Sequence, residues 1–168
     1  MNNYFSPFAE VPFVLLATAS SLGFFAMFVP INYTMLQAQA DGTDPNISAY
    51  LLAILNAGSL PGRILLGYLG GRLGRFNFMI IMCLLSALTI FWLWMPGPST
   101  TPGSNALYIV FSVLYGFASG ALVGMVPAFH GQITADPTNT GIRQGDLFTC
   151  TAVASLCGSP IAGAILDN

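Results

Sequence analysis

Residues 62–80 read GRILLGYLGGRLGRFNFMI and join two long apolar runs through a very short polar turn. The runs cover residues 48–70 and 76–95. Each is close to the ~20 residues that a helix needs to cross a hydrocarbon core about 30 Å thick. Because so few residues connect them, the two helices must be antiparallel neighbours. This stretch therefore predicts a membrane-spanning helical hairpin.

The rest of the chain repeats the pattern. Further apolar runs cover residues 11–38, 106–130 and 145–166, which brings the predicted spans to five. The chain is 55% hydrophobic and 6% charged, whereas a soluble domain carries about 25% charged residues. The sequence predicts an all-α membrane protein with five transmembrane helices, forming a single transmembrane domain over residues 1–168. It shows no basic patch, and nucleic acid is excluded as a partner.

The four arginines indicate the orientation of the chain. Arg72 and Arg75 lie in the second connection, Arg143 lies in the fourth, and Arg63 lies in the half of the second span nearest to them. The second and fourth connections lie on one side, because the chain reverses direction at each crossing. Positive charge in short loops marks the cytoplasmic side. We expect a multi-pass protein with a cytoplasmic N-terminus, the plasma membrane being favoured and an organelle membrane being the alternative.

Glycines recur at helical spacing in two of the spans. They are Gly58, Gly62, Gly67 and Gly71 in the second span and Gly116, Gly120 and Gly124 in the fourth. Helices in lipid associate where small residues let their backbones approach. These grooves predict tight helix packing, and two interpretations remain open: they hold a bundle together, or they let helices slide during transport.

Polar residues inside the spans are the candidate binding residues. Asn56, Ser59 and Arg63 follow each other at steps of three and four, so they share one face of a helix. An arginine facing lipid is expensive, whereas one beside a wet cavity can bind a carboxylate bidentately. The alternative is an arginine that extends to the lipid headgroups. Asn32 and Tyr33, beside Pro30 in the first span, are further candidates, because interrupted helices mark many transporter sites.

Residues 62–77 resemble the motif between helices eight and nine of major facilitator superfamily transporters. The resemblance is closest to the fungal monocarboxylate-transporter-like permeases. Residues 116–130 and 141–163 look like helices ten and eleven of the same family. This implies that the five spans are helices seven to eleven of a twelve-helix permease. The chain is then an incomplete one, a partial C-terminal half-bundle.

The resemblance also implies roles for several residues, and the chain differs from the family pattern at two positions. The cytoplasmic gate motif would be Gly67, Arg72, Gly74 and Arg75. The superfamily motif usually has an aspartate where this chain has Gly71, and the monocarboxylate carriers have an aspartate where this chain has Ser59. The arginine that handles substrate in those carriers matches Arg63.

Two functions remain open at this level. The first is a transporter that carries a small organic anion, such as a monocarboxylate, by alternating access between two half-bundles. Its partners would be the lipid bilayer, the solute, and the remaining helices of a full permease or another chain, with proton coupling left open. The second is a non-transporting truncated or regulatory protein that packs against a full-length permease. No catalytic, metal or cofactor site is predicted.

Overall fold

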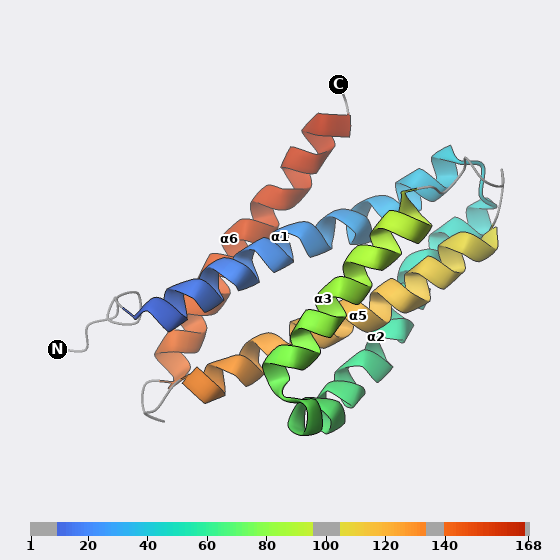
Figure 1. Cartoon of the computed structure of the whole chain (residues 1–168). Coiled ribbons are helices and arrows are strands. Elements are labelled where there is room, and N and C mark those ends of the chain that lie inside the picture. The colour runs from blue at the N-terminus through green and yellow to red at the C-terminus, as the bar shows by residue number, and fades with distance from the viewer. Residues whose placement is uncertain (1–9, 96–104, 134–139, 167–168) are drawn as a thin grey trace. The chain divides into compact units, whose positions relative to one another are not determined.

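The computed structural model of this chain describes residues 10–95, 105–133 and 140–166, and these residues are almost entirely helical. The elements are α1 (Val11–Ala40), α2 (Pro45–Leu73), α3 (Arg75–Thr89), the π-helical η2 (Ile90–Trp94) that continues α3, α5 (Asn105–Ile133) and α6 (Thr140–Leu166) (Figure 1). Within the described residues, five helices are long and apolar enough to cross a membrane, α3 and η2 counting as one. The predicted all-α membrane fold with five spans is confirmed.

α1 begins at Val11 as predicted, whereas the other spanning helices begin earlier than their predicted apolar runs. α2 starts at Pro45 instead of residue 48, because the Asp44 carboxylate accepts a 2.9 Å hydrogen bond from the Asn46 backbone N–H and caps the helix. Proline fits the first helical position, where its missing N–H is not needed. α6 likewise begins at Thr140 instead of residue 145. Most of the predicted third and fourth loops lies outside the described residues, at 96–104 and 134–139.

The chain divides into two compact units. The larger unit is Pro30–Met125, and the smaller unit combines Met1–Val29 with Val126–Asn168. The division falls inside α1 and inside α5, each of which contributes residues to both units. α1 continues as a helix through Pro30, where the sequence predicted an interruption. The single transmembrane domain expected from the sequence stays a prediction.

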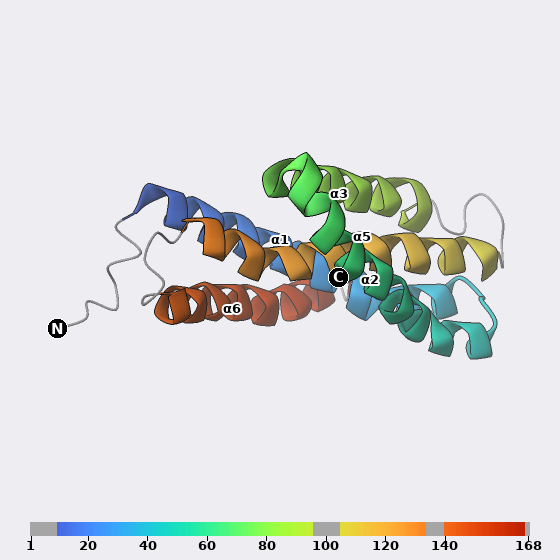
Figure 2. The same cartoon turned by 90° about the horizontal axis from the view of Figure 1, so that it is seen from below.

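The glycines of α2 bring its backbone against α5 in the larger unit, and the two helices run alongside each other in both views (Figures 1 and 2). A Cβ atom built on Gly58 would lie 2.7 Å from the Val113 carbonyl oxygen. A Cβ atom built on Gly62 would lie 2.1 Å from the Phe117 carbonyl oxygen. Neither distance is possible for a real side chain, so only glycine permits this approach.

The glycines of α5 make the reciprocal contact. A Cβ atom on Gly116 would lie 2.1 Å from the Leu55 carbonyl oxygen, and one on Gly120 would lie 2.5 Å from that of Ser59. The two helices therefore interlock backbone to backbone, over two glycines from each side. We call this contact the α2–α5 glycine interlock. Such an approach brings Cα–H groups and carbonyl oxygens into weak hydrogen-bonding range and adds dispersion contacts, the forces that join helices in lipid.

One end of the larger unit is closed by side chains from segments far apart in the sequence. The Tyr108 hydroxyl of α5 donates a hydrogen bond to the Asp41 carboxylate, which follows the end of α1. The Gln37 amide of α1 donates to the Trp94 carbonyl oxygen of η2 at 3.3 Å. Tyr108 is buried with Leu51 of α2. The ends of α1 and η2 and the starts of α2 and α5 thus meet, as successive reversals of the chain require.

An ion pair joins two helix starts in the smaller unit. Arg143, near the start of α6, donates two hydrogen bonds to the Glu10 carboxylate, which precedes α1; the Nη1–Oε2 distance is 3.0 Å. Further along α6, Gly158 lies against the Phe25 backbone of α1. The starts of these two helices therefore lie at the same end of this unit.

Replacing Gly116 by alanine should destabilise the chain, because the new methyl group overlaps the Leu55 backbone. We expect a loss of about 2 kcal/mol, as for other overpacked sites. The matched control is Gly67→Ala on α2, where a Cβ atom would meet nothing within 4 Å. Alanine is the better helix former by about 1 kcal/mol, so Gly67→Ala should be neutral or stabilising. The measurement is the thermal unfolding midpoint in detergent, and equal shifts for the two variants would contradict the interlock.

Candidate functional site

The polar face of α2 carries Asn56 and Arg63, and both side chains are exposed in this chain. Seven residues separate them, close to two helical turns, so they point to the same side. Ser59 lies between them in sequence but is buried beneath Gly120. Its hydroxyl donates a 2.7 Å hydrogen bond to the Asn56 backbone carbonyl. The structure thus places two of the three predicted α2 residues on an open face. The third, Ser59, is buried, and its hydroxyl proton is bound by the backbone.

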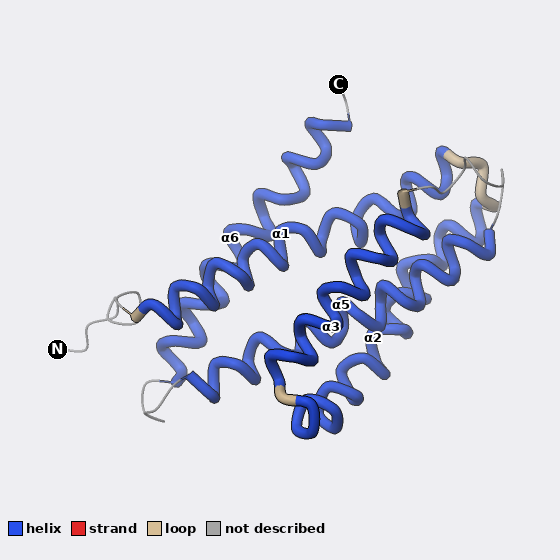
Figure 3. The backbone as a smooth tube through the Cα atoms, viewed as in Figure 1, coloured by secondary structure: helices blue, strands red, loops and turns tan. Residues whose placement is uncertain are grey.

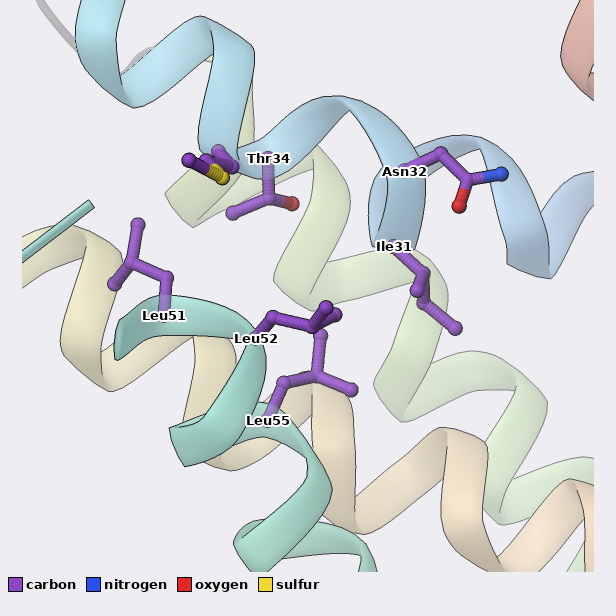
Figure 4. Close-up of a pocket in the computed structure, with 7 residues that line it drawn as sticks. Ile31, Asn32, Thr34, Leu51, Leu52 and Leu55 are labelled. Carbon is purple, nitrogen blue, oxygen red and sulfur yellow. The ribbon is translucent and has the colours of Figure 1, made fainter. Parts of the chain in front are cut away.

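A small pocket lies between α1 and α2 in the larger unit. It has a volume of about 120 Å³. It is lined by Ile31, Asn32, Thr34 and Met35 of α1 and by Leu51, Leu52 and Leu55 of α2. Figure 4 shows Leu52 and Leu55 extending from α2 toward the side of α1 that carries Ile31. Of the two predicted α1 candidates, Asn32 is exposed and lines this pocket, and Tyr33 is partly buried outside its lining.

The predicted gate motif lies at the opposite end of α2, where α3 begins. Gly74 is the sole residue between the two helices, and its φ of 84° is a conformation that L side chains rarely adopt. Figure 3 shows the junction as one tight bend. The guanidinium carbon of Arg72 lies 4.9 Å from the centre of the Tyr68 ring, a cation–π contact. Arg75 is partly buried, and Gly67 faces open space.

The structure brings the predicted residues together only in part. Asn32 of α1 lines the pocket, whereas Asn56, Arg63 and the gate residues lie outside its lining, further along α2 and at its junction with α3. Sequence reasoning missed the apolar pocket walls. Leu51, Leu52 and Leu55 look like any other membrane-facing leucines, and no sequence signal marks the side of α2 that meets α1.

Comparisons with known proteins identify the family of this arrangement. Residues 13–166 match the family model described as "Sugar (and other) transporter". The chain is 41% identical over 162 residues to "MFS transporter asaE" of Aspergillus flavus, covering 96% of this chain and 35% of that protein. The chain belongs to the major facilitator superfamily. Its predicted membership of this transporter superfamily is confirmed.

Other relatives in the superfamily are also fungal. The chain is 39% identical over 165 residues to "MFS-type transporter 1" of an Ophiocordyceps species, covering 98% of this chain and 35% of the relative. It is 34% identical over 164 residues to "Fujikurins efflux protein" of Gibberella fujikuroi, covering 97% and 34% respectively. The chain thus spans about a third of the length of these relatives.

Replacing Gly74 by alanine should destabilise the junction between α2 and α3, because a side chain at this φ is strained. Strained backbone of this kind costs about 1–3 kcal/mol. Gly71→Ala is the matched control, since Gly71 is a helical glycine with open space around its Cα. Thermal unfolding in detergent would compare them, and a Gly74→Ala variant as stable as Gly71→Ala would show that the bend does not require glycine.

Proposed function

We propose that the chain forms part of a major facilitator permease that moves a small organic molecule across the membrane by alternating access. The family match over nearly the whole chain supports a transporter, as do its five potential spans. One relative is named as an efflux protein for fujikurins, which favours export of a fungal metabolite. The observation that carries the proposal is a transporter sequence with an exposed arginine and an exposed asparagine on one face of α2.

The proposed solute carries an acidic group. An arginine at the centre of a lipid-facing helix costs at least about 2.5 kcal/mol on insertion scales, and a neighbouring asparagine adds to that cost. We therefore propose that the face with Asn56 and Arg63 borders a water-filled path. There the planar guanidinium can bind a carboxylate through two parallel hydrogen bonds. The names of the three relatives given above do not include a monocarboxylate. We therefore widen the proposed class of solute from simple monocarboxylates to organic acids.

We further propose that the five helices are helices seven to eleven, and that other helices cover their open faces. In the most apolar part of α5, 53% of the residues are buried, whereas 17% are buried in the corresponding parts of α3 and α6. α5 is therefore the most covered of these helices, and α3 and α6 leave large apolar faces for lipid or for further helices. The alternative, a regulatory protein without transport, is not favoured, because it gives no reason for an exposed Arg63 beside Asn56.

Arg63→Gln in the complete permease should reduce solute uptake or efflux at least tenfold, because charge-assisted hydrogen bonds contribute about 1.5–3 kcal/mol. Arg63→Lys keeps the charge without the planar fork, so its transport rate should lie between those of the unchanged permease and of Arg63→Gln. The neighbouring Ile64→Ala, at a side chain that is 75% exposed, serves as the matched control. Transport of a panel of organic acids is measured at equal membrane levels. Unchanged transport by Arg63→Gln for every acid would remove this residue from the mechanism.

The proposed topology places the N-terminus and the fourth connection in the cytoplasm of a cell whose plasma membrane holds the protein. Single cysteines introduced by Ser99→Cys and Thr140→Cys, in a chain without Cys83, Cys150 and Cys157, test it. An impermeant maleimide added to intact cells should label the Ser99→Cys variant and leave the Thr140→Cys variant unlabelled until the cells are opened. The opposite pattern would reverse the orientation.

A further inference from the structure

The pocket between α1 and α2 reaches the side of α2 that carries Arg63 through one of its lining residues, Leu52. Leu52 lines the pocket and is 45% exposed. Asn56 follows four residues later and Arg63 eleven residues later, close to one and three helical turns. Leu52, Asn56 and Arg63 therefore form a continuous stripe along α2. The stripe begins at an apolar pocket and ends at a guanidinium.

The pocket is suited to a hydrocarbon group. Five of its seven lining residues are aliphatic or methionine, and the Thr34 hydroxyl donates its proton to the Pro30 backbone carbonyl. The side chain of Asn32 is therefore the main polar group at its edge. The volume of about 120 Å³ approaches that of cavities of ~150 Å³ that bind benzene when lined by aliphatic side chains.

The spacing along α2 sets the length of a molecule that could reach both ends. Eleven residues at about 1.5 Å each place the backbones of Leu52 and Arg63 roughly 16 Å apart along the helix axis. Helical side chains lean toward the N-terminus, so the Arg63 guanidinium can extend toward Asn56 and shorten this gap to about 10 Å. With C–C bonds near 1.5 Å, an extended chain advances about 1.25 Å per bond, so about eight to ten carbon atoms span the gap.

We propose that the pocket and Arg63 bind one elongated organic acid, with its hydrocarbon tail between α1 and α2 and its carboxylate on the guanidinium. The Asn56 amide, between the two, is placed to contact a polar group along the chain. This inference rests on the proposed function and narrows its solute to an amphipathic acid. The charge favours a free acid as the occupant, because a phospholipid acyl chain brings no carboxylate to Arg63.

Cysteine protection in the 168-residue chain, reconstituted in phosphatidylcholine nanodiscs without Cys83, Cys150 and Cys157, tests the proposal. Leu52→Cys and Asn32→Cys report on the two walls of the pocket. Leu65→Cys is the matched control, because Leu65 is a leucine of the same helix that is 37% exposed and lies outside the pocket. It follows Leu52 by thirteen residues and therefore points away from the stripe. The reaction of each thiol with a hydrophilic maleimide is timed with acetate, decanoate or decanol present.

Decanoate should slow the labelling of the Leu52→Cys and Asn32→Cys variants at least fivefold, and acetate should have little effect. Each buried methylene group strengthens binding about fourfold, so protection should rise with chain length until the pocket is full. Decanol should protect less than decanoate, and Arg63→Gln should reduce protection by decanoate to the level of decanol. The Leu65→Cys variant should be unaffected by all three.

Two results would overturn this inference and leave the proposed function standing. One is equal protection by acetate and decanoate, which would leave Arg63 as an anion ligand and the pocket empty. The other is equal protection of the Leu65→Cys and Leu52→Cys variants by decanoate, which would reflect partition into lipid. Equal protection by decanoate and decanol, unchanged by Arg63→Gln, would instead contradict the proposed function itself.

Discussion

The backbone contact between α2 and α5 is the interaction on which the larger unit depends. Lipid offers no hydrophobic drive for two apolar helices to meet, so their association requires close approach and dispersion. Gly58 and Gly62 provide that approach on α2, and Gly116 and Gly120 provide it on α5. Because carbonyl oxygens of each helix occupy the space above glycines of the other, neither helix can rotate about its axis without a clash. The contact therefore fixes which face of α2 is covered and which is open.

That rotation determines the chemistry of the open face. With the glycines turned toward α5, Ser59 falls beneath Gly120, while Asn56 and Arg63 remain exposed on the adjoining side. The pocket against α1 has its exposed edge, Leu52, at the start of the same side. A charged group and an apolar hollow on one face suit an amphipathic molecule better than either lipid or water alone. The structural contact and the proposed transport site are thus two faces of one helix.

The junction between α2 and α3 holds the gate residues predicted from the sequence. The superfamily motif that residues 62–77 resemble usually has an acid at the position of Gly71, and this chain leaves open space there. Arg72 lies instead over the Tyr68 ring, one turn earlier on the same helix. An exposed cation–π contact contributes about 0.5–1 kcal/mol, less than a buried charge-assisted hydrogen bond. The tight bend at Gly74 forms in this chain with glycine at position 71, so its geometry does not depend on an acid there.

The sequence by itself determined the five spans, their alternating direction and the glycine spacing, because helix length and hydropathy are local properties of the chain. It misplaced helix starts such as Pro45, where the Asp44 side chain replaces a backbone partner in a segment that reads as a turn. Only the tertiary structure decided that Gly62 and Gly116 are buried in the interlock while Gly67 is open. It alone paired Tyr108 with Asp41 and formed the pocket at Leu52. These features depend on which face of one helix meets which face of another, and a repeating apolar sequence carries little record of that choice.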